Sequence, residues 1–96
     1  MLKHIVLWTL KPEAFPEGAR EMKSRLEALN GRIAGLVHLE VGIDVSKTGD
    51  SADVALYSEF EDRAALDAYQ THPEHLRAAE FIAGVRQTRA VVDYEV

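Results

Sequence analysis

The stretch Leu2–Leu10 constrains the fold most, because it is a strand with large apolar side chains on both faces. Alternate side chains of an extended strand point to opposite sides. One face receives Leu2, His4, Val6, Trp8 and Leu10, and the other receives Lys3, Ile5, Leu7 and Thr9. Strands of this kind are usually covered on both sides. The fold therefore has to supply two layers of cover for its first strand.

Length and composition indicate one small globular domain, residues 1–96. The chain is 47% hydrophobic and 28% charged, as in ordinary globular proteins. Its 11 Lys and Arg against 16 Asp and Glu give a net charge of −5, and the basic residues do not cluster, so we expect no nucleic-acid partner. We also expect no membrane partner, because no apolar run approaches the roughly 18 residues of a membrane span. The start lacks the pattern of a signal peptide and cysteine is absent, so we expect a cytoplasmic protein.

Periodicity predicts the order strand, helix, strand, strand, helix, strand. The first helix should begin near Pro16 and end at Asn30-Gly31, since apolar residues recur at helical spacing between them. Alternation predicts strands over 36–44, 53–60 and 87–95, with a turn-rich loop over 46–51. The second helix should follow Asp62, a good N-cap, and break at His72-Pro73, because proline lacks an N–H and clashes with the preceding turn.

This order is that of a ferredoxin-like fold, in the α+β class, with a four-stranded antiparallel sheet and helices on one face. The uncovered face would expose apolar residues from all four strands, and such a patch marks an interface. A second copy related by a two-fold axis would cover it. We therefore predict a homodimer through the sheet face, in which two sheets close into a dimeric α/β barrel.

The segment Tyr69–His75 (Tyr-Gln-Thr-His-Pro-Glu-His) brings proton-transfer side chains to the helix break. Because Pro73 is suited to the first position of a helix, Tyr69 falls in the last turn before the break and His75 in the first turn after it. The helix dipole and partial burial both favour a neutral His75 imidazole. Such a base could take a proton from a carbon next to a carbonyl while Tyr69 donates to the enolate oxygen. The segment predicts a catalytic acid–base pair for enolisation or aldol closure.

Three further residues are candidates for lining a pocket beside this pair. His4 and Trp8 share one face of the first strand, and His72 adjoins the break. A purely structural interpretation stays open, in which His72 caps a helix, His75 bonds to a backbone carbonyl, and His4 and Trp8 belong to the core. A metal site is not expected, because the histidines of this segment lack a third ligand at usable spacing. We also expect no cofactor.

Four segments resemble the stress-responsive dimeric A/B barrel (Dabb) family: Lys3–Trp8, Tyr57–Phe60, Tyr69–His75 and Val91–Tyr94. The resemblance extends over essentially the whole chain and implies a ferredoxin-like fold and a homodimer with a shared barrel. Some plant members of the family protect against stress. Another is a polyketide cyclase that performs an intramolecular aldol condensation without cofactor or metal.

The resemblance matches the acid–base histidine and tyrosine of that cyclase to His75 and Tyr69, and its pocket histidine to His4. Two of its aromatic residues have no counterpart, since residues 16–31 contain none and Arg86 stands where the cyclase has a tryptophan. A cofactor-free monooxygenase of the dimeric barrel type would need a more aromatic pocket than this chain offers.

Three functions stay open from the sequence. The chain could be a homodimeric A/B barrel protein with a small-molecule pocket between the sheet and the broken helix. It could be a cofactor-independent, polyketide cyclase-like lyase that uses the His/Tyr pair, or a purely structural, stress-protective dimer. A cavity lined by His4, Tyr69 and His75 would favour a small-molecule site, and solid packing there would favour the structural dimer.

Overall fold

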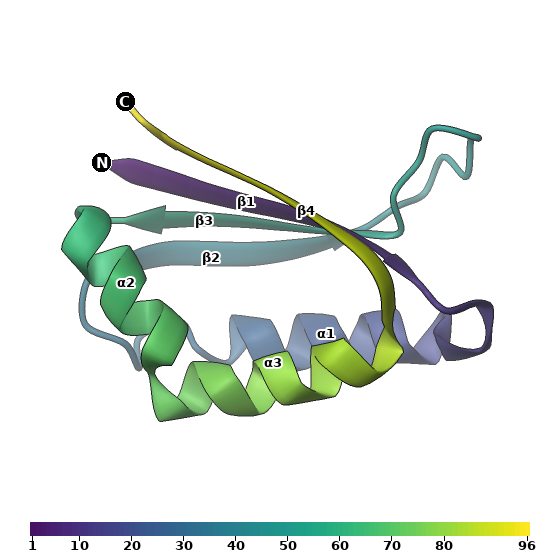
Figure 1. Cartoon of the computed structure of the whole chain (residues 1–96), viewed down its shortest axis with the longest axis horizontal. Coiled ribbons are helices and arrows are strands. Elements are labelled where there is room, and N and C mark those ends of the chain that lie inside the picture. The colour runs from purple at the N-terminus through teal and green to yellow at the C-terminus, as the bar shows by residue number, and fades with distance from the viewer.

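Four strands form one antiparallel sheet, and the helices pack on one of its faces. The computed structural model describes residues 1–96, and Figure 1 shows the sheet above the helix layer. The strands are β1 (Leu2–Leu10), β2 (Leu36–Ile43), β3 (Val54–Phe60) and β4 (Arg86–Glu95). The helices are α1 (Glu17–Glu27), α2 (Arg63–Thr71) and α3 (Pro73–Val85), and a short 3-10 turn, η1 (Pro12–Ala14), precedes α1. None of these helices is long and apolar enough to cross a membrane.

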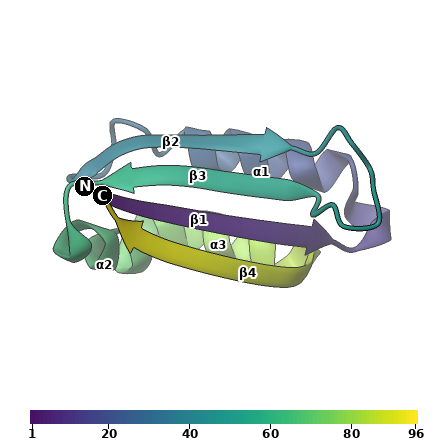
Figure 2. The same ribbon diagram turned by 90° about the horizontal axis from the view of Figure 1, so that it is seen from above.

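The strands lie in the order β2-β3-β1-β4, with the helices behind them in Figure 2. β1 pairs with β3 on one side and with β4 on the other, and both pairings are antiparallel. This arrangement confirms the predicted ferredoxin-like fold. It also places β1 in the middle of the sheet, where its inward face meets the helices and its outward face is open.

The core lies between the sheet and the helices. Each strand except β4 and each helix contributes buried apolar side chains to it, including Val6, Trp8, Leu39, Leu56, Met22, Leu26, Leu66 and Ile82. Burying a side chain of this size stabilises the fold by about 1.5–3 kcal/mol. The alternation within β1 and β3 is therefore enough to fix which of their faces is turned toward the helices.

The break between α2 and α3 is a capped junction. Asp62 begins α2, and its Oδ1 accepts a hydrogen bond from the Ala65 N–H at 2.8 Å. His72 ends α2 and begins α3, where its Nδ1 accepts from the Glu74 N–H at 3.1 Å. Pro73 is the first residue of α3 and has no N–H to leave unpaired. The junction is thus fixed by local chemistry that the sequence reveals.

Two predicted features differ from the structure. α1 ends at Glu27 rather than at Asn30-Gly31, and the Asn30 side chain instead exchanges two hydrogen bonds with the backbone of Leu39, at 2.8 and 2.9 Å. In β2 the pairing register shifts between Leu36 and His38. Alternation along this strand places Val37 on the same face as the buried Leu39 and Val41, but the irregularity leaves Val37 49% exposed, and Leu36 is buried in its place.

The sheet face away from the helices is apolar over β1 and β4. Leu7 is 44% exposed there, and Val92 is 53% exposed. Cross-strand pairing puts Val92 opposite Ile5 and Tyr94 opposite Lys3, so these side chains share the open face. Ile5, Leu7, Val92 and Tyr94 form an apolar strip along one half of the face.

The other half of the open face is polar. Glu59 accepts hydrogen bonds from Lys3 at 2.9 Å and from the Tyr57 hydroxyl at 2.6 Å. On the edge strand β2, His38 contacts Glu40 at 2.9 Å. The expectation of an apolar face over all four strands is therefore wrong for β2, whose outward positions are His38, Glu40 and a glycine.

Candidate functional site

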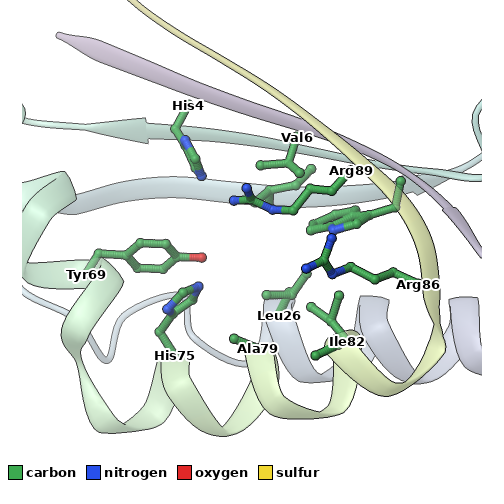
Figure 3. Close-up of a pocket in the computed structure, with 12 residues that line it drawn as sticks. His4, Val6, Leu26, Tyr69, His75, Ala79, Ile82, Arg86 and Arg89 are labelled. Atoms are coloured by element: carbon green, nitrogen blue, oxygen red, sulfur yellow. The ribbon is translucent and has the colours of Figure 1, made fainter.

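A cavity of about 210 Å³ lies between the sheet and the α2–α3 junction. Figure 3 shows side chains from both layers pointing into it. Its polar lining residues are His4, Trp8, Tyr69, His75, Arg86 and Arg89. An apolar cavity of roughly 150 Å³ can hold benzene, so this space suits a molecule of about single-ring size.

Tyr69 presents an unpartnered hydroxyl to the cavity. Its side chain is 0% exposed, and its ring packs against Phe60 and His75 with centroids 4.9 and 4.2 Å away. The hydroxyl has no hydrogen-bond partner in the protein and points into the cavity (Figure 3). Burial raises the pKa of the Tyr69 phenol well above its ordinary value, against a smaller opposing effect of Arg89. The hydroxyl is therefore a protonated donor.

His75 has the character of a neutral base. Its Nδ1 lies 3.3 Å from the carbonyl oxygen of Gln70, which can only accept, so we assign the proton to Nδ1. Nε2 then keeps its lone pair. Burial lowers the pKa of His75 below its ordinary value, and nearby Arg89 acts in the same direction, whereas the bond to Gln70 opposes the shift. A neutral imidazole with a free Nε2 is suited to accept a proton.

His4 comes with a carboxylate that the sequence did not point to. His4 lies opposite Asp93 in the β1–β4 pairing, and its Nδ1 is 2.5 Å from the Asp93 Oδ1. The His4 side chain is almost fully buried, and its ring points into the cavity (Figure 3). A carboxylate on one ring nitrogen orients the imidazole and fixes its tautomer. The sequence does contain a signal for this pair, because Asp93 is a charged residue on the same inward face of β4 as Val91.

Of the two remaining candidates for lining the pocket, Trp8 does so and His72 does not. Trp8 lines the cavity, and its indole Nε1 is buried without a hydrogen-bond partner. His72 does not line it, so the prediction of a pocket-lining His72 is corrected. Its Nδ1 is occupied by the Glu74 N–H, which makes it the N-cap of α3. No group of three His, Cys, Asp or Glu residues is placed to hold a metal ion.

Arg86 and Arg89 are cavity residues whose place sequence reasoning missed. Arg89 lies opposite Trp8 and Arg86 opposite Leu10 in the β1–β4 pairing, so both belong to the inward side of β4. Arginines at inward strand positions, where apolar residues are usual, were again the available signal. The cavity thus combines two guanidinium groups with the Tyr69 and Trp8 donors and the His75 base.

The chain belongs to a known family. Residues 2–96 match the family described as Stress responsive A/B Barrel Domain, Dabb, which confirms the resemblance seen in the sequence. No curated protein matches the chain.

Solved structures similar to this one share its fold. A dimeric protein of unknown function and ferredoxin-like fold from Bacteroides fragilis is 36% identical, with a TM-score of 0.88 over 99% of this chain and 95% of that one. A dimeric ferredoxin-like protein of unknown function from Jannaschia is 29% identical, with a TM-score of 0.84 over 99% and 98% of the two chains. The hydroxynitrile lyase from Passiflora edulis is 17% identical, with a TM-score of 0.85 over 99% and 92%, and shows the fold alone.

Proposed function

We propose that this Dabb protein binds a small carbonyl compound in the cavity and catalyses its enolisation, leading to aldol-type closure or cleavage. The observation that carries the proposal is the convergence of an unpartnered buried hydroxyl, on Tyr69, and a neutral imidazole, on His75, at one cavity of ligand size. The ring centroids are 4.2 Å apart, so one small molecule can contact both groups.

In the proposed reaction, the carbonyl oxygen of the substrate accepts a hydrogen bond from the Tyr69 hydroxyl. His75 Nε2 takes a proton from the adjacent carbon, and the electrons of the broken C–H bond move to the carbonyl oxygen as an enolate. The Tyr69 hydroxyl stabilises this negative charge. The enolate carbon can then bond to a second carbonyl, whose oxygen takes the proton back from His75. General-base catalysis of this kind contributes about 10²–10⁴-fold in rate.

The unpartnered donors favour a ligand site over a purely structural role. Buried polar groups are almost always hydrogen-bonded, and each exception calls for an explanation. Trp8 and Tyr69 both leave a donor unpaired at the same cavity. A bound carbonyl oxygen would supply the missing acceptor. A polyketide cyclase-like lyase activity is one form of this chemistry, although a cavity of about 210 Å³ suits only a small substrate.

We also propose that the open sheet face forms a homodimer. The apolar strip that includes Leu7, Val92 and Tyr94 supports it, as do the dimeric structures of similar proteins. A two-fold axis would bring two such strips together. The cavity lies on the other side of the sheet, so each protomer would keep its own site.

Hydrogen–deuterium exchange at carbon tests the catalytic proposal without knowledge of the natural substrate. Small ketones such as acetone and cyclopentanone are incubated with the protein in D2O, and loss of the α-proton signal is followed by NMR. We expect the native protein to accelerate exchange and the His75→Ala variant to lose this effect. His38→Ala, which removes an exposed histidine on the opposite face of the sheet, is the matched control. Exchange by native protein no faster than by His75→Ala would contradict the proposal.

A further inference from the structure

We infer that Arg86 and Arg89 form an anion subsite, so that the ligand of this cavity carries a carboxylate besides its carbonyl group. The inference deepens the proposed function and rests on it for the carbonyl group, since it specifies the class of substrate that the same cavity takes. The chain as a whole has a net charge of −5, so a positive subsite runs against its general charge.

Geometry brings both guanidinium groups to the cavity. Arg86 and Arg89 stand on the inward side of β4, and both line the space that contains the Tyr69 hydroxyl. Figure 3 shows the two guanidinium groups extending from the β4 side toward Tyr69 and His75. The positive charge of Arg89 adds a small effect at both groups: it opposes the rise that burial causes in the pKa of Tyr69 and adds to the fall that burial causes in the pKa of His75.

Neither arginine has an anionic partner within the protein. Other arginines pair with a carboxylate at 2.7–3.3 Å, namely Arg20, Arg25, Arg32 and Arg63. Arg86 and Arg89 make no ion pair, and the acidic residue nearest the cavity on their strand, Asp93, is already engaged by His4. Two guanidinium groups with free donors therefore face the cavity.

The balance of hydrogen-bonding groups defines the ligand. Tyr69, Trp8 and the two arginines all offer donors, whereas the acceptors are Nε2 of His75 and Nε2 of His4, whose Nδ1 faces Asp93. A matching ligand presents several acceptors and a negative charge. A carboxylate fits the planar, two-pronged donor pattern of arginine, and a carbonyl oxygen fits the Tyr69 hydroxyl. Arg86 and Arg89 are both exposed residues of the edge strand β4, so the anion subsite lies at the open side of the cavity, whereas Leu26, Leu56 and Ile82 line its apolar part.

Benzoate and benzamide test the inference, because they have the same shape and differ in charge. Their dissociation constants for the native protein are measured by calorimetry or by NMR titration. We expect benzoate to bind at least about tenfold more tightly than benzamide, which corresponds to about 1.4 kcal/mol. We expect Arg89→Met and Arg86→Met each to reduce this preference severalfold, and Arg89→Lys to retain part of it because the charge remains.

Arg77→Met is the matched control, since Arg77 also lacks an ion-pair partner but does not line the cavity. It should keep the full preference for benzoate, and circular dichroism should show all variants folded. Equal affinity for the two probes, a preference that survives both methionine variants, or binding of neither probe at millimolar concentration would overturn the inference. The proposed function fails separately, because preference for benzoate without α-proton exchange of neutral ketones would leave the anion subsite standing and remove the catalytic role.

Discussion

Replacing Tyr69 by phenylalanine should leave the fold at least as stable while it removes the catalytic donor. The substitution deletes only the hydroxyl of Tyr69. This residue is 0% exposed, and its hydroxyl has no hydrogen-bond partner in the protein. It keeps the ring and therefore the contacts with Phe60 and His75 at 4.9 and 4.2 Å. The perturbation is thus confined to a single polar atom at the wall of the cavity.

The expected change in stability follows from the missing partner. Burying a hydroxyl without a hydrogen bond costs about 1–3 kcal/mol, whereas losing a satisfied buried hydrogen bond destabilises by about 1 kcal/mol. Water in the cavity can offset part of the cost, so we expect the free energy of unfolding of Tyr69→Phe to rise by about 0–2 kcal/mol. A rise in the free energy of unfolding therefore indicates an unpartnered hydroxyl, and a fall indicates a hydroxyl that makes a hydrogen bond.

Urea unfolding followed by circular dichroism measures this change. Native protein and variant are compared at one protein concentration, because the stability of a dimer depends on concentration. Tyr57→Phe is the matched control, since the Tyr57 hydroxyl donates to Glu59 at 2.6 Å and its removal should destabilise. A loss of about 1 kcal/mol or more in Tyr69→Phe, or ketone exchange at the native rate, would refute the assignment of Tyr69 as a free donor.

Three further predictions concern pH, assembly and the helix junction. Because burial lowers the pKa of His75 below 6.5, exchange should rise with pH through an apparent pKa under 6.5 and level off above it. His75 also makes the stability of the fold depend on pH, because the unfolded chain binds a proton at this residue at a higher pH than the folded protein does. The free energy of unfolding should therefore be unaffected by His75 above pH 6.5 and should fall as the pH drops toward the lowered pKa. An exchange rate that stays constant from pH 5 to 8 would contradict the assignment of His75 as the base. Sedimentation should show a dimer for the native protein, a monomer for Val92→Asp and a dimer for Leu76→Asp, which alters an exposed residue of the helix layer; a dimeric Val92→Asp would argue against the open face as interface. His72→Ala should lower the free energy of unfolding by about 1 kcal/mol through loss of the α3 cap, with affinity for benzoate unchanged, and a large loss of affinity would mean that His72 takes part in binding.

Local patterns were sufficient for most of the fold. Alternation gave the bounds of β1, Leu2–Leu10, without error, and Asp62 and Pro73 located the starts of α2 and α3. These signals act within a few residues, so a single sequence contains them. Predictions were wrong where a distant partner decides the outcome, as at Asn30, which leaves the helix to bond with Leu39.

In the candidate site, too, the residues marked by a local pattern were predicted, and those placed by a distant partner were missed. The segment around Pro73 pointed to Tyr69 and His75, which the structure brings together at one cavity. Asp93 and Arg89 escaped notice because their roles depend on the β1–β4 register, which pairs them with His4 and Trp8. His72 was misplaced because capping and cavity lining both suit a histidine at a helix break, and only the geometry of the junction distinguishes them.

A crystal structure of the protein soaked with acetoacetate would show whether the cavity binds a ligand as proposed, because this small compound carries both a carbonyl group and a carboxylate. We expect the ligand in the cavity, with its ketone oxygen within hydrogen-bond distance of the Tyr69 hydroxyl, its α-carbon next to His75 Nε2, and its carboxylate at Arg89. A cavity closed by repacked side chains, or one that keeps only water at saturating ligand, would contradict this expectation.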